Sequence, residues 1–289
     1  MNKITIFTPT YNREETLPKL YDSIKSQKYK NFEWIIVDDG SIDNTQKIIK
    51  QWINENKVEI KYFYQKNSGK HIAINKGVNE ATGNLFFIVD SDDYLTPNAL
   101  NIINNWEKTI NKNNKYYAGI SGLKIHENGK IIGTTFKNEE YVDATSLERR
   151  KYKILGDKAE IFYTNILKKY KFPKIEGENF ISEAYIWNKI ATNGYKIRWF
   201  NEPLVICEYR ADGLSKNKGK ISEKNPKGQL LYLKELIKYE KNYIRKIAHY
   251  STYVKIAKKI YSNKEIKKQL NINLLELNIL LFISKIRGK

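Results

Sequence analysis

The stretch LFFIVDSDD, residues 85–93, places five apolar residues directly before three carboxylates. A short continuous apolar run predicts a strand that is buried on both faces, as in a parallel sheet. Carboxylates this close together repel one another, and a bound cation is the usual remedy. The stretch therefore predicts a buried strand that ends at a candidate cation site.

Three further apolar runs precede this one and alternate with helical patterns. Leu17, Leu20, Tyr21 and Ile24 recur at helical spacing, and residues 72–81 predict a short helix. Alternation on this scale predicts an α/β fold with a mostly parallel sheet and helices on both faces. The C-terminal strand ends then share one edge, where ligands bind. The three runs, each a predicted strand, are residues 4–7, 32–37 and 58–64.

Three predicted helix starts carry capping signals. A polar residue whose side chain accepts a hydrogen bond from a backbone N–H group, with Glu or Gln three positions later, is typical of a helix N-terminus. Proline is favoured at the first helical position. The signals are Asn12 with Glu15, Asp43 with Gln46, and Thr96 before Pro97.

The rest of the chain is less regular. Residues 118–123, 131–136, 198–200 and 204–209 are predicted strands, with Asn128 and Gly129 as a turn. Residues 183–192 predict a helix. After Ser215 the segment KNKGKISEKNPKG is interpreted as a polar linker, followed by Lys-rich amphipathic helices.

Polar groups follow all four of the first predicted strands. The P-loop pattern GxxxxGK[ST] is absent, so a metal held by carboxylates must carry most of any phosphate recognition. Mg²⁺ and Mn²⁺ prefer such oxygen ligands. Taken alone, DDGS is also a common turn with a helix cap, and NSG a common loop. The four segments are TPTYN (8–12), DDGS (38–41), NSGK (67–70) and DSDD (90–93).

The chain resembles the family 2 glycosyltransferases of the GT-A fold. No single motif is specific, but five segments match in order, spacing and strand context over roughly the first 210 residues. The segments are TPTYNR (8–13), VDDGSIDNT (37–45), NSGKHIAINKG (67–77), ATGNLFFIVDSDDYL (81–95) and ENFISEAYIWNKIA (178–191).

The resemblance implies a role for each strand-end segment. Asp39 would accept a hydrogen bond from the uracil N–H, as a carboxylate can. Asp90 and Asp92 form the DxD element, with Asp92 as the direct metal ligand and Asp90 toward the ribose or the metal. The bound Mn²⁺ or Mg²⁺ would stabilise the leaving nucleoside diphosphate. The other residues implied to bind the nucleotide are Pro9, Thr10, Tyr11, Asn67, Gly69, Lys70 and Ser91.

The resemblance also implies an acidic base at a helix start, a few residues before a Trp. Glu183 stands four positions before Trp187 and is the predicted catalytic base, with Glu178 as the alternative. The alternative, purely structural role of Glu183 is to stabilise the helix, because a negative charge at the N-terminus interacts favourably with the helix dipole. An inverting transferase makes one in-line displacement and needs no enzyme nucleophile.

The sequence departs from the family pattern at two places. Ile74 stands where relatives often have Arg, and Lys70 or Lys76 would supply the charge instead. Asp212 stands where many relatives have a metal-reaching His, so its role is left open. His71 adjoins Lys70 and either touches phosphate or simply opens a helix.

Composition excludes several classes of protein. Cys207 is the only cysteine, so a disulfide framework and a cysteine zinc cluster are excluded. The three histidines are far apart in sequence, which disfavours a His-rich metal site. Signal-peptide and membrane-spanning patterns are absent, so we expect a cytoplasmic protein.

The net charge of +19 is concentrated in the tail. Residues 214–289 hold 19 Lys and Arg against 5 Asp and Glu, whereas residues 1–213 hold 32 against 27. An anionic membrane surface is one partner that such a tail fits, and packing on protein, including an oligomer, is another. Solvated helix faces are the plain alternative. Nucleic acid is disfavoured because no known DNA-binding motif is present.

We therefore predict two regions. Residues 1–213 form a GT-A catalytic domain, with a nucleotide-sugar half at about 1–110 and an acceptor half at about 111–213, and residues 214–289 form a basic helical region. The predicted reaction moves one hexosyl group from a nucleotide sugar, with UDP as the nucleotide, to a glycan or lipid-linked acceptor of a cell-surface polysaccharide such as capsule or lipopolysaccharide. The enzyme would be cytoplasmic, on the inner face of the membrane if the tail docks there. The alternatives are a silent nucleotide-sugar or membrane-binding module and a nucleotidyltransferase.

Overall fold

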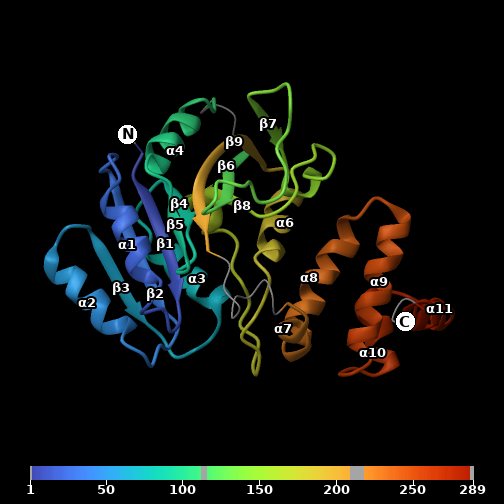
Figure 1. Ribbon diagram of the computed structural model, residues 1–289. Coiled ribbons are helices and arrows are strands. Elements are labelled where there is room, and N and C mark those ends of the chain that lie inside the picture. The colour runs from blue at the N-terminus through green and yellow to red at the C-terminus, as the bar shows by residue number, and fades with distance from the viewer. Residues whose placement is uncertain (1, 112–115, 209–217, 287–289) are drawn as a thin grey trace. The chain divides into compact units, whose positions relative to one another are not determined.

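The structure, a computed structural model, describes residues 2–111, 116–208 and 218–286 (Figure 1). The chain divides into two compact units, one of Met1–Lys174 with Asn193–Ala211 and one of Ile175–Thr192 with Asp212–Lys289. We call them the sheet unit and the helical unit and describe each by itself. Residues 175–192 thus group with the C-terminal helices, and the predicted division at residue 213 stays a prediction.

The first half of the sheet unit has the predicted alternation of strands and helices. Four strands lie parallel in the order β3-β2-β1-β4, each separated in the chain by one helix. The mixed α/β class with a central sheet flanked by helices is therefore confirmed. The elements are β1 (Ile4–Thr10), α1 (Leu17–Lys25), β2 (Phe32–Asp38), α2 (Thr45–Glu55), β3 (Ile60–Tyr64), α3 (Lys70–Glu80) and β4 (Leu85–Ile88).

Helices cover both faces of these strands because successive residues of a strand point to opposite faces. Ile4 and Ile6 pack into one core with α1, α2 and α4 (Ala99–Lys108). Phe7 points to the other face, where α3 approaches so closely that a Cβ on Gly77 would lie 2.2 Å from the Phe7 ring. Only glycine fits at position 77, and α3 is held directly against β1.

The second half of the sheet is mixed. The order continues β4-β8-β6-β9-β5, with antiparallel pairs β4–β8, β8–β6 and β9–β5 and one parallel pair, β6–β9. Strand β7 pairs with β9 off this path. The elements are β5 (Asp93–Leu95), β6 (Tyr117–His126), β7 (Tyr141–Ala144), η1 (Ser146–Glu148), β8 (Lys158–Tyr163), α5 (Thr164–Leu167) and β9 (Lys196–Cys207).

Several sequence predictions fail in this half. Residues 131–136 form no strand, and only Ile131 makes an isolated bridge to Ile125. The two strands predicted within residues 198–209 are the single strand β9, and the sequence did not predict β5, β7 or β8. The turn at Asn128-Gly129 is confirmed, with Gly129 at a φ of +78°.

The three predicted helix starts are also corrected. Helix α1 begins at Leu17, and Asn12 instead accepts a hydrogen bond from the Ile42 N–H (2.9 Å). Thr96 donates to the Pro203 carbonyl (3.0 Å), and α4 begins only at Ala99. At α2 the side chain of Asp43 does accept from the Thr45 N–H (3.0 Å), with the helix boundary at Thr45.

The helical unit has its own apolar core. Leu230, Leu233, Val254, Ile266 and Leu277, from four different helices, are all buried in it. The segment predicted as a linker is helical from residue 218 onward, so that prediction is wrong for the described part. The helices are α6 (Ala184–Thr192), α7 (Lys218–Lys224), α8 (Pro226–Tyr239), α9 (Tyr243–Ala257), α10 (Asn263–Leu270) and α11 (Leu274–Ile286).

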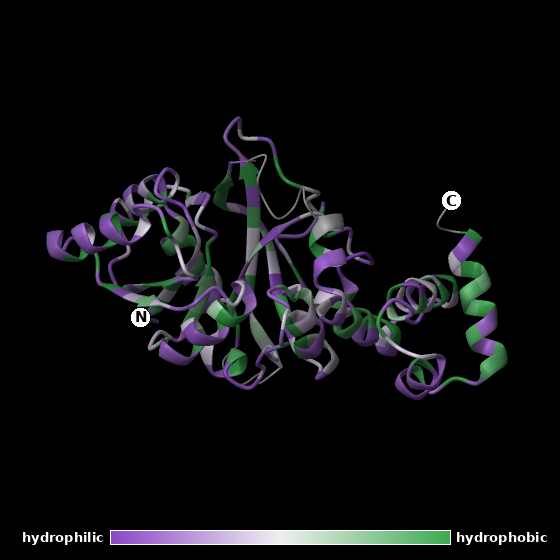
Figure 2. Ribbon diagram, turned by 90° about the horizontal axis from the view of Figure 1, so that it is seen from below, coloured by the Kyte–Doolittle hydropathy of each residue, from purple (hydrophilic) through white to green (hydrophobic). Residues whose placement is uncertain are grey.

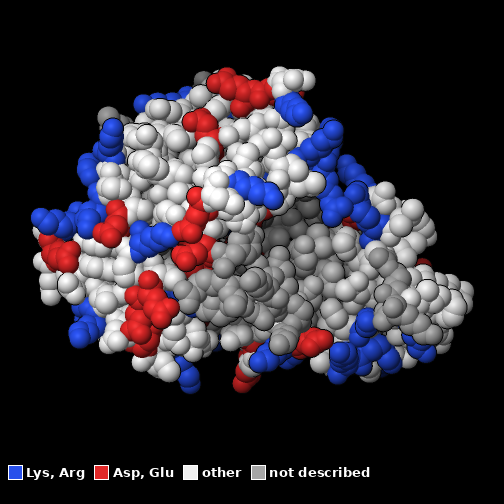
Figure 3. All heavy atoms as spheres, in the orientation of Figure 1, with Lys and Arg blue, Asp and Glu red and all other residues white. Residues whose placement is uncertain are grey.

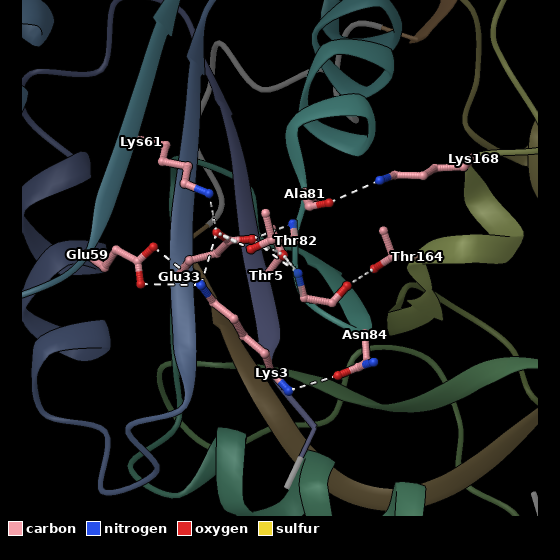
Figure 4. Close-up of polar contacts among 11 residues, drawn as sticks. Lys3, Thr5, Glu33, Glu59, Lys61, Ala81, Thr82, Asn84, Thr164 and Lys168 are labelled. Carbon is pink, nitrogen blue, oxygen red and sulfur yellow. Dashed lines mark hydrogen bonds and ion pairs between the residues drawn. The ribbon is translucent and has the colours of Figure 1, made fainter.

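A buried carboxylate joins the first four strands at their N-terminal ends (Figure 4). Glu33 on β2 is fully buried and accepts hydrogen bonds from Thr5 on β1 (2.6 Å) and Lys61 on β3 (2.7 Å). The turn before β4 adds the Thr82 N–H and hydroxyl, both at 2.8 Å, and Gly83 N–H at 3.2 Å. Burial alone would raise the pKa of Glu33, but these hydrogen bonds lower it from 4.5 to about 2.

We expect Glu33→Gln to lower the free energy of unfolding at pH 7 by about 3 kcal/mol, because it removes a buried charge that pairs with Lys61 (2.7 Å) and Lys3 (3.4 Å). A carboxyl whose pKa is lowered by folding stabilises the protein above its unfolded pKa, and this contribution is lost as pH falls from 4.5 toward about 2. Urea unfolding followed by Trp fluorescence at pH 7 and pH 3 measures both effects.

The matched control is Glu59→Gln, which removes a carboxylate whose side chain is 54% exposed and which pairs with the same Lys3. We expect it to change stability by less than about 1 kcal/mol. Equal losses for the two variants would contradict the role given to Glu33.

Candidate functional site

The ends of the parallel strands meet at one edge of the sheet unit. The Asp39 N–H donates to the Thr10 carbonyl (2.8 Å), and the Gln65 N–H donates to the Asp38 carbonyl (2.9 Å). The Thr16 hydroxyl donates to the Ser91 carbonyl (2.8 Å), which ties the loop after β1 to the DxD segment. The four polar segments that follow these strands therefore converge, as their parallel arrangement predicts.

Asp39, directly after β2, is only 6% exposed and is held by the loop between β3 and α3. Its Oδ1 accepts from Gln65 Nε2 (2.7 Å) and the Ser68 N–H (2.8 Å), and its Oδ2 accepts from the Gly69 N–H (2.8 Å). A carboxylate has about four lone-pair sites. The described residues use three of them, so one site on Oδ2 remains for another donor.

Asp38 has a different environment from its neighbour. It is fully buried, and its Oδ1 accepts from the Ser41 N–H (2.7 Å) while its Oδ2 accepts from the Tyr62 hydroxyl (2.9 Å). Burial and the nearby Asp38 raise the pKa of Tyr62. Asp38 thus fixes the turn that presents Asp39.

The other residues predicted to bind nucleotide lie around this edge. Tyr11, next to the buried end of β1, is 45% exposed, and Asn67 is exposed on the neighbouring loop. Gly69 has a φ of +92°, a conformation that glycine adopts without strain, and Lys70 opens α3. Pro9 and Thr10 are the last two residues of β1.

Lysines compensate the carboxylates of the DSDD segment. Lys70 forms an ion pair with Asp90 Oδ1, whereas Lys76 pairs with Glu80 (3.0 Å) farther along α3. Of the two lysines weighed for the charge near the DxD element, Lys70 is therefore the one that contacts it. Burial would raise the pKa of Asp90, but the nearby lysines hold it at about 2. Burial and the charge of Asp90 raise the pKa of Asp92.

Lys124 on β6 was not predicted from the sequence. Its side chain is 10% exposed, and its ammonium group lies 3.2 Å from Asp93 Oδ2, 3.4 Å from Asp157 and 4.0 Å from Asp90. Burial lowers the pKa of Lys124, but the three carboxylates outweigh this and raise it well above its usual value. The sequence pattern gave no signal, because Lys124 directly follows the predicted strand 118–123 and its carboxylate partners come from distant parts of the chain.

Cys207 also belongs to this cluster. Its thiol donates to Asp93 Oδ2 (3.2 Å), and burial raises its pKa, so it stays protonated at neutral pH. A partly buried, protonated thiol of this kind is unreactive. Asp93, the third carboxylate of the DSDD segment, pairs with Lys124 and accepts from Cys207.

The two candidate bases belong to the helical unit. Glu178 caps α8, with Oε1 accepting from the Lys227 N–H (2.8 Å) and Oε2 from the Gly228 N–H (2.7 Å). Glu183 directly precedes α6, and its backbone carbonyl accepts from the N–H groups of Ile186 and Trp187. Both carboxylate oxygens of Glu178 thus have a structural function, which favours Glu183 as the base.

Two residues that the sequence left open have different outcomes. His71 is 2% exposed, lies edge-on to Phe172, and neither ring nitrogen has a hydrogen-bond partner among the described residues. Burial lowers its pKa to about 4, so it is neutral at pH 7. This environment is that of a core residue at a helix start. Asp212 lies outside the described residues.

Asp90 and Asp92 form a donor set that fits a divalent cation. Among residues 2–111, 116–208 and 218–286, no three His, Cys, Asp or Glu side chains are arranged to hold a metal ion. Mg²⁺ is usually held by one or two carboxylates together with substrate phosphates, so two aspartates suffice. A cation would also relieve the repulsion that raises the pKa of Asp92.

Comparison with known proteins identifies the family. A family model described as glycosyl transferase family 2 matches residues 5–154, more than half of the chain. The chain belongs to this family. The match covers the first four strands and the DxD segment, and it confirms the resemblance found in the sequence.

Relatives and solved structures of glycosyltransferases agree with this assignment. A GalNAc(5)-diNAcBac-PP-undecaprenol beta-1,3-glucosyltransferase of Campylobacter jejuni is 27% identical over 69% of this chain and 62% of its own length. S. aureus TarS 1–349 in complex with UDP-GlcNAc has a TM-score of 0.64 at 20% identity, over 95% of this chain and 77% of that one. Mannosyltransferase PcManGT from Pyrobaculum calidifontis, in complex with GDP-Man and Mn²⁺, has a TM-score of 0.58 at 16% identity, over 90% and 76%.

At identities of 20% and 16%, the likeness to these solved structures shows the fold alone. The chain spans 32% of the length of one curated relative that it matches and 62% of another.

We expect Lys124→Met to lower the free energy of unfolding by about 3 kcal/mol, because it leaves the buried carboxylate of Asp93 without its cation. The control is Lys19→Met, which removes an exposed ion pair with Glu127 and should change stability by less than about 1 kcal/mol. Urea unfolding at pH 7 measures both. A loss for Lys124→Met no larger than the control would contradict the compensating role of Lys124.

Proposed function

We propose that this family 2 glycosyltransferase moves one sugar from a nucleotide sugar, with UDP as the nucleotide, to a hydroxyl group of a glycan acceptor. The observation that carries the proposal is the buried Asp39, whose carboxylate keeps one lone-pair site beyond the three that Gln65, Ser68 and Gly69 use. A carboxylate accepts well from the ring N–H of uracil, and cytosine lacks this donor.

The remaining strand-end residues surround the donor in this proposal. Tyr11, partly exposed beside Asp39, offers a ring face for the base, with Pro9 and Thr10 forming the floor. Asn67 and Gly69 lie on the loop that holds Asp39 and would approach the ribose or the diphosphate. Tyr11 would thus contact the base of a nucleoside diphosphate, and Asn67 and Gly69 its ribose or phosphates.

Asp92, with Asp90, would hold a divalent cation such as Mn²⁺ or Mg²⁺, which when bound stabilises the charge of the leaving nucleoside diphosphate. Lys70 adds positive charge at the same place, because its ammonium group pairs with Asp90. When the donor is bound, its ribose or phosphate would replace part of the contact between Lys70 and Asp90. The Thr16 hydroxyl donates a hydrogen bond to the backbone carbonyl of Ser91, and this bond helps to position the DSDD segment.

Glu183 is the proposed base. Its carboxylate would accept the proton of the acceptor hydroxyl while that oxygen bonds to the anomeric carbon and the bond to the diphosphate oxygen breaks. One displacement from the face opposite the leaving group inverts the anomeric configuration. The capping role of Glu178 on α8 supports this choice between the two carboxylates.

A lipid-linked glycan is the proposed acceptor class, as in the synthesis of a capsule or lipopolysaccharide. The Campylobacter jejuni relative carries an undecaprenol-linked glycan in its name. A silent nucleotide-sugar binding module would bind UDP without releasing it from a sugar. A nucleotidyltransferase is disfavoured because the loop after β1, TPTYNR, is not Gly-rich.

We expect metal-dependent release of UDP from one member of a panel of UDP-sugars, measured with Mn²⁺, with Mg²⁺ and with EDTA. Asp92→Ala should lower the rate by about 100-fold or more, because it removes the carboxylate proposed to hold the cation. Unchanged release in Asp92→Ala or in EDTA would contradict metal dependence. UDP binding without release from any donor, with acceptor present, would favour the silent module.

Glu183→Gln and Glu178→Gln form a matched pair of tests in one unit. Glu183→Gln should lower turnover by about 100-fold or more and leave the melting temperature close to that of the wild type. Glu178→Gln should lower thermal stability, because it weakens the cap of α8, and retain most of the turnover at low temperature. Turnover lost in Glu178→Gln but kept in Glu183→Gln would reverse the assignment.

A further inference from the structure

Helix α11 carries an apolar stripe on its exposed side. Leu275, Ile279, Phe282 and Ile286 are 70%, 50%, 65% and 60% exposed. Their spacing of four, three and four residues places them on one helix face. Figure 2 shows α11 as hydrophobic along most of its length, at the end of the chain's last helices. We call these four residues the α11 stripe.

The opposite side of α11 is already in use. Leu277 and Leu280 are buried in the core of the helical unit, where α11 packs against α9. A helix that is apolar on all sides normally lies in a protein interior or against lipid. The packing of Leu277 and Leu280 accounts for one side only, so the α11 stripe needs a second apolar environment.

The length of α11 rules out one such environment. Its 13 residues extend about 20 Å, whereas a bilayer core is about 30 Å thick. In the part of the chain that the structure describes, no helix has the length and apolar character needed to cross a membrane. The stripe therefore fits a surface on which α11 lies flat.

The charge around the stripe indicates which surface this is. Residues 243–286, helices α9 to α11, contain nine Lys and Arg and two Glu. Figure 3 shows Lys and Arg over the C-terminal helices with few acidic groups among them. A second copy of the chain would bring two strongly positive helical units together, which is unfavourable. An anionic lipid surface offers both an apolar layer and the opposite charge.

We propose that the α11 stripe docks on an anionic lipid bilayer, with its apolar side chains in the acyl boundary and the lysines of α10 toward the headgroups. Lys264 and Lys268 are exposed on α10, which adjoins α11. The proposal concerns the helical unit alone and holds whichever donor the strand-edge site uses.

The test is sedimentation of the full chain with phosphatidylcholine vesicles that contain about 30% phosphatidylglycerol, or none. The wild type should bind the anionic vesicles, with an affinity that falls as salt rises, and bind the neutral vesicles at least about tenfold more weakly. Ile279→Ser with Phe282→Ser should lower the affinity for anionic vesicles by about tenfold or more. Lys264→Glu with Lys268→Glu should also weaken binding to anionic vesicles.

The matched control is Ile131→Ser with Leu155→Ser, two side chains 39% and 45% exposed on the sheet unit, which should leave vesicle binding unchanged. All these residues are on the surface, so each variant should melt at the wild-type temperature. Release of UDP without vesicles should be unaffected by the stripe variant, which separates this proposal from the proposed reaction.

Three results would overturn the proposal. The first is a wild type that pellets with neither vesicle, and the second is a stripe variant that binds as well as the wild type. The third is a wild-type dimer in light scattering that the stripe variant converts to monomer, which would assign the stripe to a second copy of the chain.

Discussion

The buried carboxylate of Glu33 fixes the part of the sheet on which the candidate site depends. It joins β1 through Thr5, β3 through Lys61, and the turn before β4 through Thr82. All of these contacts lie at the N-terminal ends of the strands, and the candidate site lies at their C-terminal ends. Because the strands are parallel, fixing their register at one end also fixes which residues meet at the other.

At the C-terminal ends of the strands, the negative charges that follow β4 are compensated by positive charges from other elements. Asp90, Asp92 and Asp93 follow β4 directly, and the lysines that compensate them come from α3 and β6. Lys124 reaches Asp93 and Asp157 from the second half of the sheet, so this half stabilises the acidic segment electrostatically. Burial and the charge of Asp90 raise the pKa of Asp92, and burial with the neighbouring aspartates raises that of Asp93, so a bound cation would relieve the repulsion within this segment.

The sequence predicted the first half of the fold because its information is local. The runs that form β1, β2 and β4 are buried almost throughout, β3 is half-exposed, and one helix separates each strand from the next. The convergence of Asp39, Lys70 and Asp90 therefore follows from topology. The second half depends on long-range antiparallel pairs. The strand KAEIFY, β8, alternates poorly and is defined by its pairing with β4 and β6.

The same limit applies to single residues. Lys124 becomes notable only when Asp93 and Asp157 are brought to it, and the cap that Glu178 makes exists only once α8 is placed. The roles assigned to Pro9, Thr10, Tyr11, Asp39 and the DxD aspartates remain predictions, since family membership fixes the fold and not the contacts with a ligand.

Isothermal titration with UDP and with CDP in the presence of Mn²⁺ tests the central claim most directly. The free lone-pair site of Asp39 can accept from the ring N–H of uracil, and cytosine has no hydrogen at that position. We predict that UDP binds at least about tenfold more tightly than CDP, and that Asp39→Asn removes this preference. Equal affinities of the wild type for the two nucleotides, or no binding of UDP, would contradict it.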